Sequence, residues 1–545
     1  MADGLSTRYK DLLSGSYDCV DRIVLNAYFR MAHSAGGFRI WWRALTGSDE
    51  DLDDAHLMRL AGRFSRRLRA YAKLHGIPVI DCAAGERKDE VVDDYLGKTK
   101  ITCGLFLILV GRAQAPVWHV MSNHHLTRRD PMPYVNHYFF HILDPDWGHM
   151  IFRISGHPPF PVQIILNGHE YVACQARKAG IVFTKEANCF TNMSDAAGLA
   201  KIADTLCEVS AIGRLSQICE RWIYTACLCF ALDLAEQKKS GFHYQYSHYQ
   251  IEYSRNLIFD LGHQMDQVFQ ALTDRSRSAL NVAAAKTILG YKTRPRYPKR
   301  KGRSSEWTVT VERPTYDLTV FTLHCGKITL KMYTKGERVL RSEAIAHNTE
   351  ELDIGRSLEK FPECVARLKD MLERFLNVLG CIDQCFISDS MLDQLPTASQ
   401  VGKTKVGGLD LNKTRVLAVA QAVIALAPTP RGFTASQLAA EVRRASGQGE
   451  TQYGPRRAAY DLKKLRGKQI VQRIGKTRRY ETIPTGLKAI TALLVLRDKA
   501  IKPLLAAAVE ARPSRGTQNP HGIDSYYETI RVAMKGVFQE LGVAA

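Results

Sequence analysis

Hydrophobic side chains recur with two different periods along this chain, and the alternation between the two periods predicts a mixture of helices and strands. In residues 52–75, apolar side chains recur at the helical spacing of three and four residues. In residues 134–154, apolar and polar residues alternate on both sides of an Asp-Pro-Asp-Trp-Gly turn, which predicts a β-hairpin. Because strand and helix patterns continue to follow one another, we expect an α/β core over residues 1–194.

Two apolar runs, DRIVLNAYF and GGFRIWWRAL, dominate residues 21–45 of this core. Both are rich in β-branched and aromatic residues, and the Gly36-Gly37 pair between them is typical of a turn. We therefore expect two paired strands here, preceded by a short helix within residues 1–20.

The rest of the chain divides into further segments, so the whole is predicted to be an α+β protein with a mixed N-terminal α/β core, a small central β-sheet domain and a C-terminal winged helix-turn-helix. Within the mainly helical region of residues 195–290, residues 242–250 are expected to be extended and residues 251–289 to return to helix. The segments are a mainly helical region (195–290), a Pro-rich basic linker (291–306), a small sheet plus a helix (307–400), a winged helix (412–500) and a helical tail (501–545).

The winged-helix prediction rests on the order of elements between residues 412 and 488. An apolar-faced helix from Thr414 is followed by a second helix that Thr434 caps and by a third helix that Pro455 opens. Two short strands, IVQRI and RRYETI, then surround a Gly-Lys-Thr turn. In such a module the third helix enters the major groove and the turn contacts phosphates, although related modules mediate protein contacts instead. The predicted nucleic-acid-binding residues here are Arg456, Arg457, Lys463, Lys464, Arg473, Lys476, Arg478 and Arg479.

Charge changes this picture, because the positive surplus is confined to two segments. The 545 residues include 75 Lys and Arg against 55 Asp and Glu, a net charge of +20. Residues 412–488 hold 16 basic and 4 acidic residues, and residues 286–303 hold 8 basic and no acidic residues, so the rest of the chain is neutral. Concentrated charge indicates a polyanionic partner, most simply nucleic acid; the alternative is a solvated face plus a basic linker. The linker residues predicted to bind nucleic acid are Arg294, Arg296, Lys299, Arg300, Lys301 and Arg303.

Several classes of protein are excluded by what the sequence lacks. No apolar run is long enough to span a membrane, and the first residues lack the apolar centre of a signal peptide. Thirteen mostly isolated cysteines favour reduced thiols, so we expect a cytoplasmic protein with no membrane partner. There is no phosphate-binding Gly-rich loop, no Cys-x-x-Cys pair and no His-Glu-x-x-His motif. No pattern sets an oligomeric state.

The hairpin of residues 134–154 carries the first candidate for metal chemistry. Asp144 and Asp146 lie in its turn, and His137, His141 and His149 lie on its strands. Carboxylates and imidazoles together can hold a divalent cation, Mg²⁺ or Mn²⁺, for phosphoryl transfer. The alternative is ordinary turn chemistry, because aspartate caps turns and glycine adopts positive φ.

The second candidate lies in the segment KITLKMYTKGERVLRSEAI, residues 327–345. Strand alternation places Lys331 and Tyr333 on one face, and Glu343 follows on the next strand. A tyrosine hydroxyl beside cations can attack a phosphodiester while Glu343 binds a metal, and Glu252 from a nearby aromatic segment is a further catalytic candidate. The alternative is a basic sheet face that grips a backbone while Tyr333 stacks on a base.

Two resemblances accompany these motifs. LDPDWGHMIFRISGHPPFPVQIILNGHEYVACQARKAGI, together with GGFRIWWRALTG, GIPVIDCAAGERKDEVVDDYL and LKMYTKGERVLRSEAI, resembles a family of uncharacterised bacterial proteins that share this core and a terminal winged helix. Lys331-Met-Tyr333-Thr-Lys335-Gly336 followed by Leu340-Arg341-Ser-Glu343 is similar to a motif of rolling-circle replication initiators of filamentous phages and plasmids. The second resemblance implies a tyrosine that nicks DNA with the help of a metal ion.

Two functional hypotheses follow. The first is a metal-dependent DNA nicking or strand-transfer endonuclease of a bacterial mobile element, and the second is a non-catalytic DNA- or RNA-binding protein, such as a regulator or the partner of a structured RNA. An enzyme requires Asp144, Asp146 or Glu252 to lie within a few ångströms of Glu343 or Tyr333, whereas a binding protein requires only basic surfaces.

Overall fold

A computed structural model describes most of the chain. It covers residues 3–279, 307–383 and 393–497, together with residues 525–526, 529–530 and 532–533. Within these ranges it leaves out residues 51, 84, 99–100, 102, 122–124, 187, 316–317, 326–327, 411–412, 430, 448 and 450.

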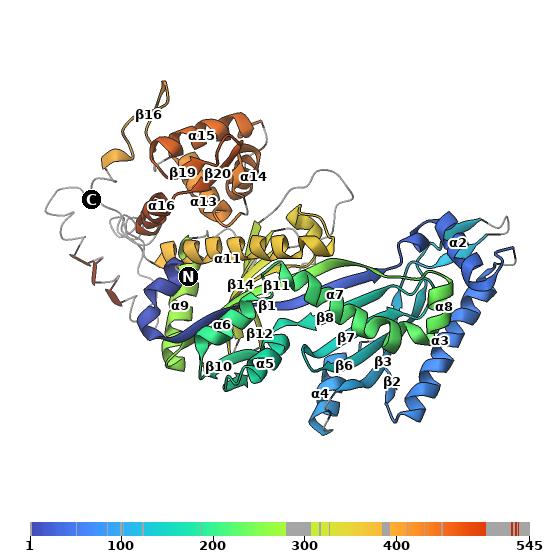
Figure 1. Cartoon of the computed structure of the whole chain (residues 1–545). Helices are drawn as coiled ribbons and strands as arrows, with labels where there is room; N and C mark the ends of the chain where they lie inside the picture. Colours follow the sequence, from blue (N-terminus) through green and yellow to red (C-terminus); the bar gives the residue numbers. More distant parts are fainter. Residues whose placement is uncertain are drawn as a thin grey trace, which may run out of the picture.

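The described part of the chain is an α+β protein built on one 11-stranded sheet (Figure 1). Neighbouring strands are antiparallel except β2 and β3, which are parallel. From one edge to the other the strands are β12 (Trp307–Thr315), β13 (Leu318–Cys325), β14 (Ile328–Lys335), β15 (Val339–Ala346), β11 (Gln245–Phe259), β1 (Leu13–Tyr28), β8 (Val162–Asn167), β7 (Gly148–Ser155), β6 (Tyr134–Asp144), β3 (Gly104–Gln114) and β2 (Val79–Asp81).

Besides the large sheet, the described residues up to residue 406 form helices and three small two-stranded ribbons. The predicted helix over 52–75 and the predicted hairpin over 134–154 are both present. The helices are α1 (Gly4–Arg8), α2 (Ala35–Thr46), α3 (Asp54–Leu74), α4 (Lys88–Lys98), α5 (Gly168–Lys178), α6 (Ala196–Asp204), α7 (Ser210–Trp222), α8 (Leu234–Lys239), α9 (Gly262–Ala279) and α11 (Phe361–Asp383). The ribbons are β4 (Trp118–Val120) with β5 (Leu126–Arg128), β9 (Phe183–Glu186) with β10 (Cys189–Met193), and β16 (Ser399–Val401) with β17 (Thr404–Val406).

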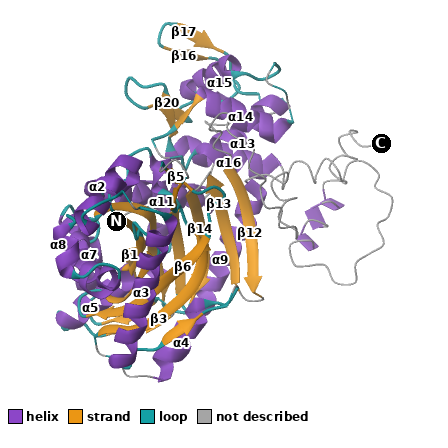
Figure 2. Ribbon diagram, turned by 90° about the vertical axis from the view of Figure 1, so that its right-hand side faces the viewer, coloured by secondary structure: helices purple, strands orange, loops and turns teal. Residues whose placement is uncertain are grey.

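The small central sheet predicted for residues 307–400 is not a separate unit. β15 pairs with β11 along its whole length, so β12 to β15 extend the large sheet instead of forming their own (Figure 2). β11 also occupies residues 251–259, where a return to helix was predicted. β11 and β15 pair with each other although they are far apart in the sequence. Such long-range pairing leaves no signal in local periodicity.

The prediction of a strand over GGFRIWWRAL is wrong, because Ala35–Thr46 forms helix α2. Ser34 caps the helix by accepting a hydrogen bond from the Gly37 amide, and Gly47 ends it with a φ of 99°. Its buried side chains recur at helical spacing: Phe38, Trp41, Trp42 and Leu45. The residues that precede it do form a strand, β1, which begins earlier than expected, at Leu13.

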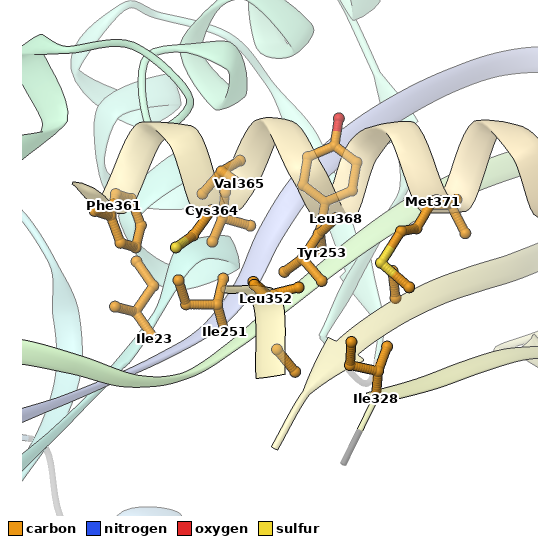
Figure 3. Close-up of a cluster of buried hydrophobic side chains, with 14 of the residues drawn as sticks. Ile23, Ile251, Tyr253, Ile328, Leu352, Phe361, Cys364, Val365, Leu368 and Met371 are labelled. Atoms are coloured by element: carbon orange, nitrogen blue, oxygen red, sulfur yellow. The ribbon is translucent and has the colours of Figure 1, made fainter. Parts of the chain in front are cut away.

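One face of the central strands is covered by α11 (Figure 1). The buried side chains of α11 recur at helical spacing, so they form a continuous apolar stripe. Figure 3 labels Phe361, Cys364, Val365, Leu368 and Met371 of this stripe over Ile23, Ile251, Tyr253, Ile328 and Leu352. Because side chains alternate along a strand, the polar residues between these apolar ones face the opposite side of the sheet.

The C-terminal segment folds as helices around a three-stranded sheet of order β18-β20-β19. Arg374 of α11 forms an ion pair with Glu481 of this segment at 3.4 Å, on the side where α16 contacts α11. Its elements are α13 (Thr414–Leu426), β18 (Phe433–Thr434), α14 (Ala435–Ser446), α15 (Pro455–Gly467), β19 (Val471–Arg473), β20 (Arg479–Thr482) and α16 (Pro484–Leu496).

No helix in the described ranges is both long enough and apolar enough to span a membrane.

Candidate functional site

A polar pocket of about 420 Å³ opens on the face of the sheet opposite α11. It contains all four predicted catalytic residues, and we call it the Tyr333 pocket. Its walls come from β1, β8, β11, β14 and β15, with α4 and the start of α5 at the rim. The predicted catalytic residues that line it are Glu252, Lys331, Tyr333 and Glu343.

Strand register brings these residues together. Lys331 lies opposite Glu343, and Tyr333 lies opposite Arg341, in the pairing of β14 with β15. On the other side of β15, Ser254 of β11 lies opposite Glu343. Directly paired residues project to the same face, so three strands direct polar groups into one pocket.

The carboxylate of Glu343 is the centre of the contacts in the pocket. The Tyr333 hydroxyl donates a hydrogen bond to Glu343 Oε1 at 2.6 Å, and Lys331 Nζ lies 2.9 Å from Glu343 Oε2. Arg341 Nη1 lies 3.5 Å from Oε1. Glu343 is 3% exposed, so its charge depends on these partners for compensation.

A β-bulge in β1 adds Asp21 to the same pocket. The pairing of β1 with β11 shifts between Val20 and Ile23, which leaves Asp21 and Arg22 without partners on β11. Such bulges redirect side chains and are common beside functional sites. Ser254 Oγ donates to Asp21 Oδ1 at 2.9 Å, so the redirected carboxylate reaches the strand that carries Glu252.

His169, at the start of α5, contacts the bulge of β1 through Asp21. Its Nδ1 lies 2.8 Å from Asp21 Oδ1, and its Nε2 lies 3.1 Å from Arg341 Nη2. The chain can pass this close only because residue 168 is a glycine, since a Cβ there would lie 1.7 Å from the carbonyl oxygen of Val20. A close approach of two backbones is one of the few needs that glycine alone meets.

Asp21 and His169 were not predicted as site residues. The sequence did contain a signal, because an Asp-Arg pair interrupts the apolar strand CVDRIVL, and a Gly-His pair directly follows the strand VQIIL and one asparagine. Charged residues inside a strand that is otherwise apolar are expensive to bury, and so they are candidates for a site.

The clustered charges shift several pKa values in the pocket. Burial raises the pKa of Glu252, and the nearby Glu343 and Asp21 raise it further. Burial also raises the pKa of Tyr333, and Glu343 adds to the shift, so the phenol stays protonated unless a base removes its proton. For Asp21, burial acts to raise the pKa, but Arg341 and His169 outweigh it and hold the pKa below its ordinary value.

Two sets of side chains are relevant to a metal ion: a group buried beside the Tyr333 pocket, whose ligand atoms lie close together, and the carboxylates that line the pocket. Cys19, Asp21 and His169 form a buried group that could hold one, because a ligand atom from each lies within 4.8 Å of the others. Thiol and imidazole ligands suit zinc and other transition metals better than Mg²⁺ or Mn²⁺. Two features of this group oppose metal binding. The Nε2 of His169 is already in contact with Arg341, and burial raises the pKa of the Cys19 thiol well above its ordinary value. The carboxylates of Asp21, Glu252 and Glu343 are the ligands that Mg²⁺ and Mn²⁺ prefer.

Asp144 and Asp146, the predicted metal ligands, do not line the Tyr333 pocket. Asp144 accepts hydrogen bonds from the backbone amides of Asp146 and Trp147, and its other oxygen accepts from Arg221 and Trp222. Asp146 pairs with Arg221 and with Lys178. These contacts are those of a capped turn tied to α7, which is the alternative that the sequence left open.

The histidines of the hairpin are divided between two sites. His141 and His149 line the Tyr333 pocket, with His141 Nδ1 and His149 Nε2 at 3.0 Å from each other. Burial lowers the pKa of His141 to about 3, with His149 contributing, so this imidazole is neutral near pH 7. His137 lines a separate hollow.

The predicted nucleic-acid-binding residues of α15 and the turn after it lie mainly at the surface. Arg456 and Arg457 are exposed near the start of α15, whereas Lys464 is half-buried and donates to the carbonyl of Gly408 at 3.4 Å. Lys463 is half-buried. In the turn between β19 and β20, Lys476 and Arg478 are exposed, Arg473 donates to backbone carbonyls of the turn itself, and Arg479 donates to the carbonyl of Gly432. The linker residues Arg294, Arg296, Lys299, Arg300, Lys301 and Arg303 lie outside the described residues.

Comparison with known proteins identified no relative of this chain. No family model matches the chain, no curated protein matches it, and no solved structure matches it.

Proposed function

We propose that this protein is a nucleic-acid-binding enzyme that nicks or transfers a strand at the Tyr333 pocket with the help of a divalent cation. The observation that carries the proposal is the hydrogen bond from the Tyr333 hydroxyl to the buried carboxylate of Glu343, in a pocket that also holds Glu252 and Asp21. This arrangement provides a nucleophile, a base and candidate metal ligands within one concave site.

The chemistry follows from the protonation states. The pKa of Tyr333 lies above its ordinary value, so the phenol needs a base at the moment of attack, and Glu343 already accepts its proton in a hydrogen bond. Glu343 takes the phenol proton, the phenolate oxygen forms a bond to phosphorus, and the bond from phosphorus to one sugar oxygen breaks. That oxygen leaves as a hydroxyl with the proton that Glu343 took, passed on through water, so the carboxylate is regenerated. The strand remains attached as a phosphotyrosine ester, which a free hydroxyl of another strand end can reverse or redirect.

The cations and carboxylates of the pocket divide the remaining roles. Lys331 and Lys335 line the pocket beside Tyr333, where their charge opposes the negative charge that develops on the phosphoryl oxygens. Glu252 and Asp21 repel each other and Glu343, which raises the pKa of Glu252. A divalent cation would relieve this repulsion and polarise the phosphate.

The C-terminal segment supports a nucleic-acid partner. We propose that it is a winged helix-turn-helix, with α15 as the recognition helix and the turn between β19 and β20 as the wing, because its order of helix, strand, helix, helix, strand and strand matches the order expected for that module. The exposed Arg456 and Arg457 favour this role. The resemblance of the Tyr333 motif to rolling-circle replication initiators points to DNA of a mobile element as the substrate.

A denaturing gel tests the enzymatic proposal. Labelled single-stranded DNA, duplex DNA and RNA are incubated with the full chain and Mg²⁺ or Mn²⁺, and a label that stays with the protein after denaturation reports the phosphotyrosine ester. We expect Tyr333→Phe to abolish the covalent product while binding is retained, and Glu343→Gln to slow its formation about 100-fold or more.

Tyr253→Phe is the matched control. Tyr253 lies on β11 next to the same strands, but on the face toward α11, and its hydroxyl donates to Asp18 at 2.8 Å. It reproduces the loss of one buried tyrosine–carboxylate hydrogen bond without touching the pocket. A covalent product that survives Tyr333→Phe, or that is lost equally with Tyr253→Phe, contradicts the assignment of the nucleophile.

The second candidate function is non-catalytic binding of a nucleic acid. It is favoured by the raised pKa of Tyr333 and by Lys331 Nζ, which lies 5.1 Å from the centre of the Tyr333 ring, because a protonated tyrosine beside a cation is a good surface for stacking a base. Binding of all three nucleic acids without any cleavage in either metal would leave this function in place of the enzyme.

A further inference from the structure

A second and larger hollow, of about 1200 Å³, lies beside the Tyr333 pocket, where β1 and β7 end and β8 and β11 begin. Four arginines line it, and we call it the arginine hollow. In the described part of the chain, none of the four forms an ion pair with a carboxylate, in contrast to Arg221 on α7 and to the buried Arg255 and Arg341. The four arginines are Arg30, Arg128, Arg153 and Arg356.

The charge facing the hollow is strongly one-sided. Glu359 is the one acidic residue that lines it in the described chain, and its carboxylate is engaged with Ser357. The Nε of Arg153 is buried and has no hydrogen-bond partner among the described residues. Burial lowers the pKa of Arg153 and of Arg128 with no acidic group to oppose it. A cation held in this way is stabilised when an anion binds.

Aromatic side chains lie next to the arginines of the hollow. Tyr28 and Tyr246 line the hollow, where the Tyr246 hydroxyl donates to Glu220 of α7 at 2.6 Å. The guanidinium of Arg153 lies 5.6 Å from the centre of the Phe139 ring beside the hollow. A sheet face that combines arginines with aromatic rings is one of the common ways in which proteins bind unpaired bases and the phosphates between them.

The hollow and the Tyr333 pocket are neighbours on the same strands. On β8, Gln163 lines the hollow and Ile165 lines the pocket, and on β7 the corresponding residues are Arg153 and Ile151. Residues two apart on a strand lie on one face at a separation of roughly 7 Å. From Tyr333 on β14 to Arg153 on β7 there are five strand spacings, about 24 Å, which is a distance that a strand of several nucleotides can follow.

We infer that the arginine hollow binds the phosphodiester backbone of a single-stranded nucleic acid and leads that strand across the sheet to the Tyr333 pocket. This inference rests on the proposed function for the fate of the strand, but binding in the hollow does not require cleavage. The observation behind it is the juxtaposition of four arginines without acidic partners, aromatic rings, and the strands β7 and β8 that the hollow shares with the Tyr333 pocket.

Fluorescence anisotropy with a labelled 12-residue thymidine oligonucleotide, in the absence of divalent cations, measures the binding. We expect the full chain with Arg153→Gln and Arg356→Gln to bind about 100-fold more weakly, roughly tenfold for each arginine. The slope of log affinity against log salt should fall by about 0.7 for each phosphate that is no longer bound. Arg59→Gln, an exposed arginine on α3 outside the hollow, is the control and should bind as the unmodified chain does.

The double variant Arg153→Lys, Arg356→Lys keeps both positive charges. The slope of log affinity against log salt should therefore stay the same. If the double glutamine variant unfolds, Arg356→Gln alone serves, because Arg356 is exposed. Anisotropy of that variant equal to the Arg59→Gln control overturns the inference.

Photocrosslinking locates the strand and separates it from smaller ligands. An oligonucleotide with 4-thiothymidine should crosslink to peptides that contain Tyr28, Phe139 or Tyr246, and crosslinks confined to residues 393–497 would overturn the inference. Thymidine monophosphate that displaces the 12-residue strand at equal affinity would also overturn it, because the hollow would then be a mononucleotide site.

The two proposals fail in different ways. If the arginine variants weaken binding and no substrate is ever cleaved, the hollow is a binding track and the nicking function is wrong. If Tyr333 forms a covalent product while the arginine variants bind normally, the nicking function stands and the track is wrong.

Discussion

Two tyrosine–carboxylate pairs on nearby strands show that the surroundings of a side chain, and not its hydrogen bond, decide what it can do. Tyr253 and Tyr333 each donate to a buried carboxylate, at 2.8 Å to Asp18 and at 2.6 Å to Glu343. Asp18 is held on both oxygens by Arg255 and is 4% exposed. Glu343 instead lines a pocket with further carboxylates, so its tyrosine faces that pocket and not a closed core.

The candidate residues at this scale were partly predictable. Alternation along residues 327–345 was enough to place Lys331, Tyr333 and Glu343 together, because neighbouring strands joined by a tight turn have a fixed register. Asp21 and His169 could not be placed in the same way, because their convergence depends on a bulge and on a pairing between strands that are distant in the sequence.

His248 provides a prediction about stability and pH. Its imidazole is fully buried, and burial lowers its pKa from 6.5 to about 4, with Arg356 contributing. The unfolded chain therefore takes up a proton at higher pH than the folded chain does. The stability contributed by the neutral imidazole is fully present above pH ~6.5 and is lost as the pH falls toward 4, which amounts to about 2–3 kcal/mol at pH ~4.5.

Urea unfolding between pH ~7.5 and ~4.5 measures this loss, because the window spans the pKa of the unfolded imidazole. We expect the free energy of unfolding of His248→Asn to fall less steeply with decreasing pH than that of the unmodified chain, even if it starts lower because Thr349 and Cys364 lose a partner. Parallel curves for the two proteins would mean that this imidazole does not titrate between the two states.

At the scale of elements, the sequence predicted local structure well wherever one period ran without interruption. The helix α3, the β6–β7 hairpin and the order of elements from α13 to β20 follow patterns that short-range contacts enforce. The helix α2 was missed because Gly36-Gly37 indicated a turn, although the four aromatic and leucine side chains after it have helical spacing. The union of β12 to β15 with the large sheet was missed because β11 and β15 are far apart in the chain.

The junction of β1 with α5 yields a prediction at this scale. Gly168→Ala would put a Cβ 1.7 Å from the carbonyl oxygen of Val20, so the bulge that directs Asp21 must move. We expect a loss of about 1–3 kcal/mol in the free energy of unfolding, together with weaker binding of Mn²⁺ in the Tyr333 pocket.

Gly213→Ala is the matched control for this change. Gly213 also lies in a helix, α7, but a Cβ there would meet nothing within 4 Å. This variant should be stabilised by roughly 0.5–1 kcal/mol, because alanine favours a helix interior more than glycine does. Gly168→Ala that behaves like Gly213→Ala in chemical denaturation would show that the bulge tolerates a side chain.

At the scale of the whole molecule, basic surfaces lie on different parts of the chain with different geometry. The arginine hollow is a concave part of the sheet, whereas Arg456 and Arg457 lie on the exposed start of a helix. The ribbon β16–β17 contacts α15, and Lys464 in the later part of that helix is bound to the backbone of Gly408. The start of α15 is therefore the part that is accessible to a duplex.

Substitutions in α15 and in the basic linker should have different effects on DNA binding. Neutralising Arg456, Arg457, Lys463 and Lys464 should remove the preference among duplex sequences if α15 enters a major groove, because base edges are read there. Of these four, Arg456 should account for most of the effect, since it is exposed, whereas Arg457 donates to the carbonyl of Gln452 and Lys464 to that of Gly408. Neutralising Lys299, Arg300, Lys301 and Arg303 should instead weaken all sequences alike and lower the salt slope by about 0.9 for each phosphate that is released, because a Pro-rich basic segment follows phosphates and reads no bases. Competition binding against a random duplex library at two salt concentrations measures both quantities, and an equal decrease of preference in the two variants would remove base recognition from α15.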